Sequence, residues 1–229
     1  MDAAEIRLDA LCVDAGGTRI IDEVSLEVAV RRLAVIGANG SGKSTLLRVL
    51  DGLMRPSAGA VRVLGLDPVR EAKALRRQVG FVFTNPDTQI VMPTVREDLA
   101  FSLRGLRLPR DEVRARVDAW LDRYELLDRA DVPAHSLSGG QKQTLAIAAV
   151  LIREPRLVLA DEPTTMLDLG NARRISRLLV DELPGPVVIA THDLALARRC
   201  DLAIRFEAGR IIRVGDPAEV VDEYERAFA

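Results

Sequence analysis

Nine residues, G-A-N-G-S-G-K-S-T from Gly37 to Thr45, combine glycines with a lysine and hydroxyl side chains. Gly40 and Gly42 let backbone N–H groups turn toward an anion without obstruction by side chains. Lys43 supplies a positive charge for the outer phosphates of a nucleotide, and the Ser44 hydroxyl suits Mg²⁺. The spacing therefore predicts a nucleotide-triphosphate loop, whose expected binding residues are Gly37, Asn39, Gly40, Ser41, Gly42, Lys43, Ser44 and Thr45.

Two acidic residues and a histidine form a second candidate group. Asp161 and Glu162 follow the apolar run Leu157–Ala160, and His192 follows another apolar run. A buried carboxylate at Asp161 would hold Mg²⁺ together with Ser44. Glu162 would orient an attacking water, and His192 would contact the γ-phosphate. The alternatives are a solvated acidic pair, which the preceding apolar strand disfavours, and an ordinary polar histidine.

A third feature is the sequence L-S-G-G-Q, Leu137 to Gln141, at the start of an expected helix. Because the N-terminus of a helix attracts anions, Ser138-Gly139-Gly140 is a second candidate for binding phosphate. Alone this is a weak signal, since many helices begin with Ser and Gly. One such helix start and one glycine loop per chain suggest a two-fold dimer that encloses two nucleotides.

The elements that position these residues alternate between strands and helices. Such alternation predicts an α/β protein with a mostly parallel sheet, which binds ligands at the carboxyl ends of its strands. The glycine loop, Asp161-Glu162 and His192 all lie at such ends. The expected strands are 5–13, 20–30, 33–36, 60–64, 78–83, 157–160, 187–190, 202–206 and 210–214, and both the first pair and the last pair form hairpins. The expected helices are 46–50, 71–77, 94–103, 109–126, 138–152, 170–183 and a short one after Pro217.

Residues 85–134 differ from the flanking portions because their pattern is helical. Thr94 is the expected N-cap of the first helix in this section, and Trp120 is expected to anchor its core. We therefore expect a single domain over residues 1–229. In it, 85–134 is a helical subdomain inserted between the core portions 1–84 and 135–229.

The composition narrows the class of function. With 229 residues, 48% hydrophobic and 29% charged, the chain has the composition of a soluble globular protein. A net charge of −2 and an aromatic content of 3% argue against a nucleic-acid partner. The longest apolar run, Leu145–Ile152, is shorter than the ~20 residues of a membrane helix, and no secretory segment is expected. Cys12 and Cys200 show no metal or redox spacing, so both are expected to be core thiols in a reducing compartment.

Together, these motifs resemble the ATP-binding-cassette (ABC) ATPases over essentially the whole chain. The Walker A motif would be Gly37–Thr45, the family signature Leu137–Gln141 and the Walker B motif Leu157–Glu162. Asp168 would be the D-loop aspartate and His192 the switch histidine. Five motifs in the family's order make the resemblance specific. Beyond the Walker A loop, it implies these nucleotide-binding residues: Ser138, Gly139, Gly140, Gln141 and Asp168.

The resemblance implies a P-loop NTPase fold, with a RecA-like core, an N-terminal antiparallel β portion and a helical subdomain. It implies ATP and Mg²⁺ as ligands, and a head-to-tail dimer in which each ATP lies between one Walker A loop and the partner's Ser138-Gly139-Gly140. Glu162 would be the catalytic base, His192 the γ-phosphate sensor and Lys43 a further catalytic residue. Complete motifs on one chain favour a homodimer.

The resemblance also implies membrane partners. Hydrolysis would move a transmembrane coupling subunit and a substrate-binding subunit, with the ATPase held peripherally on the cytoplasmic face of a bacterial cell membrane. The helical section would supply the docking surface, with 84–97 nearest the partner's coupling helices. The alternative for this section is a helical lid without a partner.

Within the family, V-G-F-V-F-T-N-P-D-T-Q-I, Val79 to Ile90, resembles the energy-coupling factor importers of vitamins and of nickel or cobalt. These ATPases typically read V-F-Q-N-P-D-x-Q, so Thr84 stands in place of the Q-loop glutamine. Gln89, or a water held by Thr84, would have to replace the missing contacts. Threonine at this point is a feature of the biotin-type members, so biotin is the first expected cargo.

The expected adenine contact also departs from the family. The aromatic residue that usually stacks on adenine would fall near Val13 or Asp14, and neither is aromatic. We therefore expect adenine to lie on aliphatic surface and GTP to be poorly excluded.

Three other functions are alternatives to this one. The first is the ATPase of another kind of ABC transporter. The second is a soluble ABC ATPase of translation or DNA repair, and the third is a degenerate cassette that only binds nucleotide. The soluble enzymes generally carry two cassettes or a long coiled-coil insertion, which this chain does not show. A degenerate cassette is disfavoured because Lys43, Asp161, Glu162 and His192 are all present.

Overall fold

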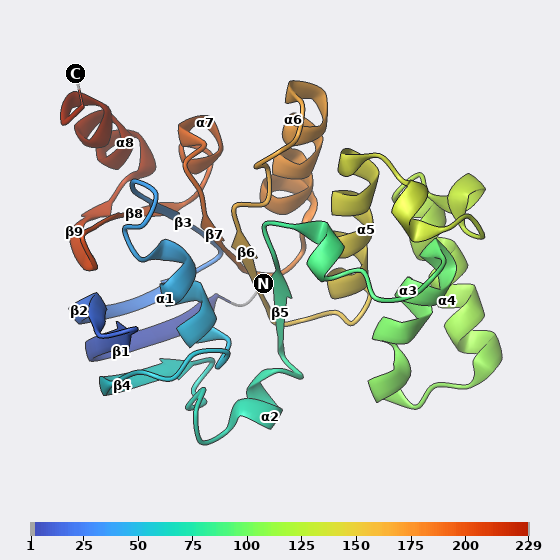
Figure 1. Cartoon of the computed structure of the whole chain (residues 1–229), viewed down its shortest axis with the longest axis horizontal. Coiled ribbons are helices and arrows are strands. Elements are labelled where there is room, and N and C mark those ends of the chain that lie inside the picture. The colour runs from blue at the N-terminus through green and yellow to red at the C-terminus, as the bar shows by residue number, and fades with distance from the viewer. Residues whose placement is uncertain (1–2, 229) are drawn as a thin grey trace. The chain divides into compact units, whose positions relative to one another are not determined.

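The computed structural model describes residues 3–228, which divide into two compact units. The core unit comprises the described residues up to Phe81, Arg156–Glu162 and those from Ser176 onward. The helical unit comprises Val82–Pro155 and Pro163–Ile175. Figure 1 labels the elements of both. The predicted single domain over residues 1–229, with a helical subdomain at 85–134, stays a prediction.

The core unit contains a six-stranded sheet in the order β5-β6-β7-β3-β8-β9. β3 pairs in parallel with β7 and β8, β6 pairs in parallel with β7, and β8 and β9 form an antiparallel hairpin. All residues of β3, β6 and β7 are buried, as expected for strands covered on both faces. The mostly parallel sheet is confirmed. Its strands are β3 (Arg32–Ile36), β5 (Val79–Val82), β6 (Leu157–Asp161), β7 (Val187–Ala190), β8 (Leu202–Glu207) and β9 (Arg210–Gly215).

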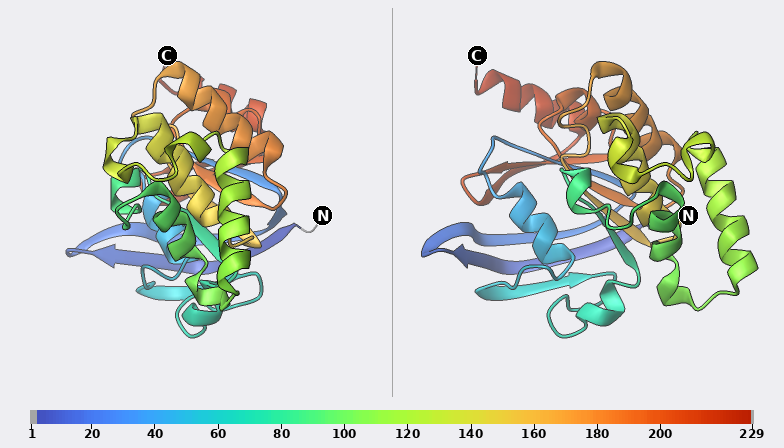
Figure 2. Two further views of the ribbon diagram at one scale, coloured as in Figure 1. Left: turned by 90° about the vertical axis from the view of Figure 1, so that its right-hand side faces the viewer. Right: turned by 45° about the vertical axis from the view of Figure 1, so that its right-hand side comes forward.

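A second, antiparallel sheet of the core unit has the order β2-β1-β4. It consists of β1 (Ala4–Ala15), β2 (Thr18–Val30) and β4 (Ala58–Val63), which lie side by side in Figures 1 and 2. Ala4, Ile6 and Leu8 are buried and alternate with exposed residues, which is the period of a half-buried strand. The predicted N-terminal hairpin is confirmed, and β4 adds a third strand at the other edge of β1.

The helices of the core unit match the sequence pattern only in part. The expected helix over 71–77 is a single turn, and the short helix α7 was not predicted because four residues are too few to show a period. The expected helix over 170–183 begins one residue earlier and changes to a π-helix at Leu178. These helices are α1 (Lys43–Leu50), α2 (Ala72–Leu75), the π-helix (Leu178–Glu182), α7 (Leu194–Ala197) and α8 (Pro217–Arg226).

The helical unit is built on four helices, and α4 lies beside α3 (Figure 2). Thr94 caps α3 through a capping box with Glu97, as its position predicted. Trp120 is half-buried and stacks on Tyr124 at 5.4 Å between ring centroids, so the core positions of α4 are Val117 and Leu121 instead. The helices are α3 (Val95–Ser102), α4 (Arg110–Arg123), α5 (Gly139–Leu151) and α6 (Leu169–Arg177), with 3₁₀ turns at Pro86–Thr88, Arg104–Leu106, Leu127–Arg129 and Ala134–Ser136.

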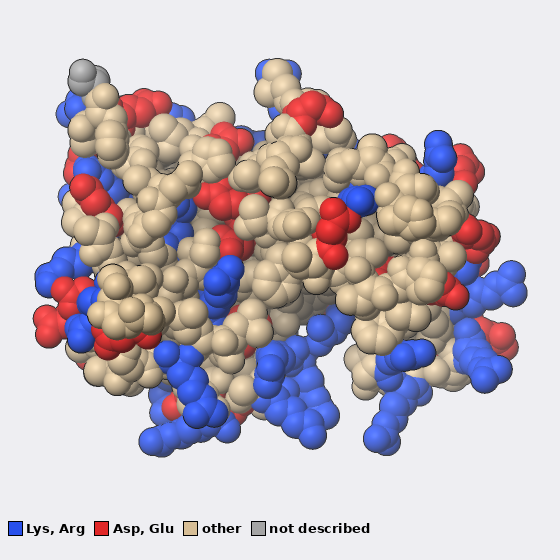
Figure 3. Space-filling model, viewed as in Figure 1, with Lys and Arg blue, Asp and Glu red and all other residues tan. Residues whose placement is uncertain are grey.

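Basic side chains, cysteines and helix lengths are further features of the described residues. Lys and Arg side chains gather over α2 in Figure 3, where Arg70, Lys73 and Arg77 are exposed. Cys12 and Cys200 are free and buried, as expected, and burial raises the pKa of Cys200 to about 12. Every helix among residues 3–228 is too short or too polar to span a lipid bilayer.

Candidate functional site

Three neighbouring strands bring the predicted phosphate and catalytic residues to one edge of the sheet. In the register of the strands, Asp161 pairs with Ala190, and Ala190 pairs with Val35. The carboxyl ends of β6, β7 and β3 are therefore level. Glu162 follows β6, His192 follows β7 and the glycine loop follows β3, as the sequence indicated.

Lys43 and Ser44, the first residues of α1, make the central contacts of the loop. Lys43 Nζ donates to the carbonyl oxygens of Gly37 at 2.8 Å and Ala38 at 3.0 Å. Ser44 Oγ donates to Asp161 Oδ1 at 2.7 Å. Burial lowers the pKa of Lys43 and raises that of Asp161. Both groups are thus held out of water, where their charges act strongly on a bound anion or cation.

Glu162 lies between the lysine and the histidine. Its Oε2 is 2.7 Å from His192 Nδ1, and its Oε1 is 3.9 Å from Lys43 Nζ. The Glu162 backbone has a φ of +50°, which is unfavourable for a residue with a side chain. Its N–H donates to Ala190 O at 2.8 Å, so the neighbouring strand fixes this conformation. The sequence did not indicate this conformation, in which the Glu162 carboxylate contacts His192 and Lys43.

Phe206, in β8, is a residue of the loop's surroundings that the sequence did not indicate. A Cβ on Gly37 would lie 2.0 Å from the Phe206 carbonyl oxygen, and one on Gly42 would lie 2.8 Å from the Phe206 ring. Gly40 has open space around the same position, although its φ is +77°. Gly37 and Gly42 are therefore required by the close approach of β8, and Gly40 only by its backbone conformation.

This difference predicts unequal costs of two matched substitutions. Gly37→Ala forces a methyl group against backbone that cannot move aside, so we expect a loss of about 3 kcal/mol in the free energy of unfolding. Gly40→Ala has only the backbone term, about 1 kcal/mol. Chemical denaturation of both variants checks this. Equal losses would contradict the close approach of Phe206 to Gly37.

The remaining loop residues differ in exposure. Asn39 and Gly40 are exposed, and Thr45 is half-buried. Ser41 is buried, and its Oγ has no hydrogen-bond partner among the described residues. A buried hydroxyl without a partner is costly unless a ligand satisfies it. The loop therefore has an unused donor at the position where the sequence predicts phosphate.

The other predicted nucleotide-binding residues lie in the helical unit. Ser138 caps α5: its Oγ accepts from Gln141 N at 3.3 Å, and its N–H donates to Gln141 Oε1 at 3.0 Å. Gly139 has open space around it. Asp168 accepts hydrogen bonds at the start of α6 and is not buried. Ser138, Gly139 and Gln141 thus form a capped helix start of the kind that binds anions.

The structure bears on the replacement expected for the Q-loop glutamine. Gln89 Oε1 accepts from Phe83 N at 3.1 Å, and Gln89 Nε2 donates to Ala146 O at 2.9 Å. Its amide therefore braces the segment after β5 against α5. Because both the oxygen and the nitrogen of the Gln89 amide are hydrogen-bonded, Gln89 is a poor replacement for the Q-loop glutamine. A water held by Thr84 is the remaining expectation.

The turn between β1 and β2 differs from the expected aliphatic surface. Val13 is fully buried, and Asp14 pairs with Arg19 at 2.6 Å. Arg19 also pairs with Asp22 at 3.0 Å. Asp14 and Arg19, two of the exposed residues at this turn, are charged and offer hydrogen bonds rather than an apolar face. Poor exclusion of GTP stays a prediction.

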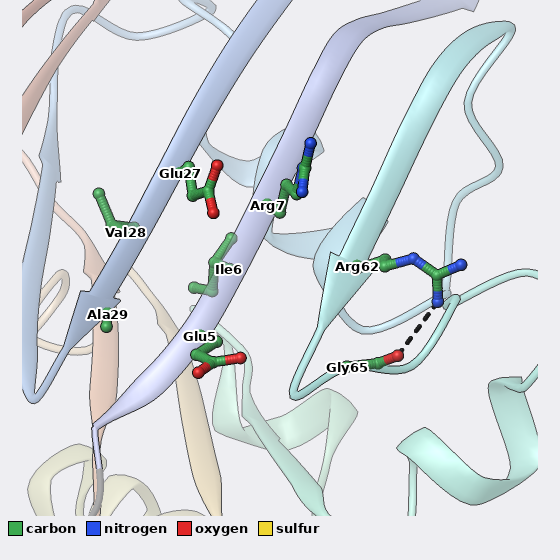
Figure 4. Close-up of a pocket in the computed structure, with 8 residues that line it drawn as sticks. All are labelled: Glu5, Ile6, Arg7, Glu27, Val28, Ala29, Arg62 and Gly65. Atoms are coloured by element: carbon green, nitrogen blue, oxygen red, sulfur yellow. Dashed lines mark hydrogen bonds between the residues drawn. The ribbon is translucent and has the colours of Figure 1, made fainter.

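A surface hollow of about 340 Å³ lies elsewhere in the core unit, on the antiparallel sheet (Figure 4). Arg62, one of its lining residues, donates to Gly65 O at 3.1 Å. None of the predicted site residues lines it. The lining residues are Glu5, Ile6, Arg7, Glu27, Val28, Ala29, Arg62 and Gly65.

Comparisons with known proteins agree with this fold. The family model described as ABC transporter matches residues 21–165. The biotin transport ATP-binding protein BioM of Rhizobium etli is 36% identical over 98% of this chain and 99% of its own length. The energy-coupling factor transporter ATP-binding protein EcfA1 of Bacillus subtilis is 41% identical over 88% of this chain and 74% of its own.

A solved structure shows the same fold. The structure of cbiO1 from Clostridium perfringens, described as part of the ABC transporter complex cbiONQ, superposes with a TM-score of 0.85. The two chains are 35% identical, and the match covers 99% of this chain and 93% of that one.

The fold and the glycine loop define a nucleotide-binding ATPase of the P-loop class. The chain belongs to the ABC transporter family, whose ATP-binding subunits hydrolyse ATP, and its relatives include those of the energy-coupling factor type.

Proposed function

We propose that this chain is the ATP-hydrolysing subunit of an energy-coupling factor importer, and that two copies enclose two ATP molecules. The observation that carries the proposal is the cluster of Lys43, Ser44, Asp161, Glu162 and His192 at one sheet edge, linked by the contacts of 2.7 to 3.9 Å described above. A buried positive charge such as that of Lys43 is suited to stabilise the charge of a transferring phosphoryl group.

Each residue of the cluster has a distinct task. The glycine loop cradles the β- and γ-phosphates, and Lys43 exchanges its bonds to backbone carbonyls for phosphate oxygens. Glu162 accepts a proton from the attacking water. His192, whose Nδ1 faces Glu162, has Nε2 left for the γ-phosphate. Ser138-Gly139-Gly140, Gln141 and Asp168 of the partner copy close the site.

The residues present fit Mg²⁺. Ser44 Oγ and Asp161 Oδ1 are 2.7 Å apart, and both are hard oxygen donors of the kind Mg²⁺ prefers. Mg²⁺ usually takes one or two protein oxygens and completes its shell with waters and phosphates. When bound, the ion would neutralise phosphate charge.

The cargo and the membrane partners are the finer part of the proposal. We propose a transmembrane coupling subunit and a substrate-binding subunit, with the ATPase on the cytoplasmic face of a bacterial membrane. Biotin is the first candidate cargo, supported by the similarity to BioM over nearly the whole chain and by Thr84. A transition-metal ion is the alternative.

The test is purification of the tagged chain from membranes of its own organism, followed by reconstitution of the copurified complex into vesicles. We expect membrane proteins to copurify and labelled biotin to accumulate only with ATP. Uptake of nickel or cobalt instead would replace biotin as the cargo. Purification without any membrane protein would favour a soluble ABC ATPase and contradict the transport role.

A further inference from the structure

The side chain of Asn171, in the first turn of α6, contacts two separate segments of the helical unit. On one side, Asn171 Nδ2 donates to Asp168 Oδ2 at 2.7 Å, and Asn171 N donates to Asp168 Oδ1 at 2.9 Å. Ala172 N also donates to Asp168 O at 2.8 Å. Asp168 thus caps α6, and the bonds from Asn171 hold the pKa of its carboxyl below the usual range.

On its other side, Asn171 lies directly against Gly140 in α5. A Cβ on Gly140 would be 2.3 Å from both Cγ and Oδ1 of Asn171. The preceding glycine, Gly139, has nothing within 4 Å of the same position. Of these two glycines, Gly140 is therefore the one whose missing side chain makes room for Asn171.

The contact joins two segments that each have hydrogen bonds of their own. The Ser138 end of α5 is fixed by its capping box with Gln141, and Thr144 Oγ1 donates to Gly140 O at 2.9 Å. Next along α6, Arg174 donates to Tyr124 O at 3.1 Å. Because Arg174 anchors α6 independently, the loss of the Asn171 amide would loosen only the Asp168 turn.

We propose that Asn171 is a positioning residue, which holds the Asp168 turn and the Ser138-Gly139-Gly140 loop in one fixed arrangement. The proposal rests on the proposed function, in which both segments close the nucleotide site of a partner copy. If the turn and the loop move independently, a partner that engages one no longer orients the other. Misplaced groups in the closed site lower the rate of hydrolysis, whereas the affinity of the separate glycine loop for ATP stays the same.

The test is Asn171→Ala in the purified protein with any membrane partners that copurify. We expect kcat for ATP hydrolysis to fall about tenfold or more. The affinity of the isolated Asn171→Ala chain for ATP and its thermal midpoint should stay unchanged. Gly140→Ala tests the packing: alone its methyl group overlaps Asn171 and lowers the thermal midpoint. In the double variant with Asn171→Ala, the midpoint recovers to that of Asn171→Ala, and kcat does not.

The outcomes separate the two proposals. A kcat within twofold of the original chain overturns the role of Asn171, and so does a loss of kcat matched by a loss of thermal stability. In both cases the proposed function stands, provided that the original chain hydrolyses ATP and the Lys43→Ala variant does not. If the original chain is no more active than Lys43→Ala, the proposed function fails and the role of Asn171 fails with it.

Discussion

Glu162→Gln is expected to abolish ATP turnover and leave ATP bound. The amide keeps the size of the side chain and a hydrogen bond to His192, which lies 2.7 Å away, but it cannot accept a proton from water. Loss of a general base costs about 10²- to 10⁴-fold in rate. Phosphate release under saturating ATP, together with the retention of ATP after gel filtration, measures both effects.

The matched control is Glu27→Gln, which removes an exposed carboxylate of β2 that has no predicted role. It should leave turnover unchanged. If Glu162→Gln retained more than about a tenth of the original rate, the reduction would be smaller than the loss of a general base causes. Glu162 would then not be the base. Loss of ATP binding in this variant would instead assign Glu162 a structural part in the loop.

Lys43→Ala is expected to have the second large effect, a loss of nucleotide affinity. Lys43 is 5% exposed, and its ammonium group donates to the loop carbonyls of Gly37 and Ala38. A charge-assisted hydrogen bond contributes about 1.5–3 kcal/mol. We therefore expect ATP affinity to fall roughly 10- to 150-fold, measured by titration calorimetry, with ATP hydrolysis lost as well.

Lys73→Ala is the control for this prediction, because Lys73 is exposed on α2. Its affinity for ATP should match that of the original chain. An unchanged affinity in Lys43→Ala would show that the nucleotide does not rely on this lysine, and the assignment of the glycine loop would fail. The thermal midpoint of Lys43→Ala is expected to stay near the original value. This measurement separates a loss of ATP affinity from unfolding of the variant.

Local signals in the sequence predicted the parts of the fold that depend on neighbouring residues. The capping box at Thr94 is complete within four residues, and the apolar run of β6 ends at the expected pair of acids. The glycine loop likewise follows its strand and opens α1. These elements are stabilised by interactions between residues that are close together in the sequence, so the local pattern predicts them.

Contacts between distant segments could not be predicted in this way. Phe206 is 169 positions beyond Gly37 in the printed sequence, yet its carbonyl oxygen decides that Gly37 cannot carry a side chain. The same holds for Asn171 and Gly140. The positive φ of Glu162 arises from the bond of its N–H to the adjacent strand. Tertiary contacts between distant segments determine these features, so neither a hydrophobic period nor a sequence motif predicts them.

The most direct test of the account asks whether one nucleotide site is built from two copies of the chain. Lys43→Ala removes the glycine-loop half, and Ser138→Arg blocks the helix-start half. Each variant alone should be inactive. In a mixed dimer one site carries both defects and the other is intact, so an equal mixture is expected to recover about a quarter of the original activity. A mixture no more active than either variant alone would contradict the two-copy site.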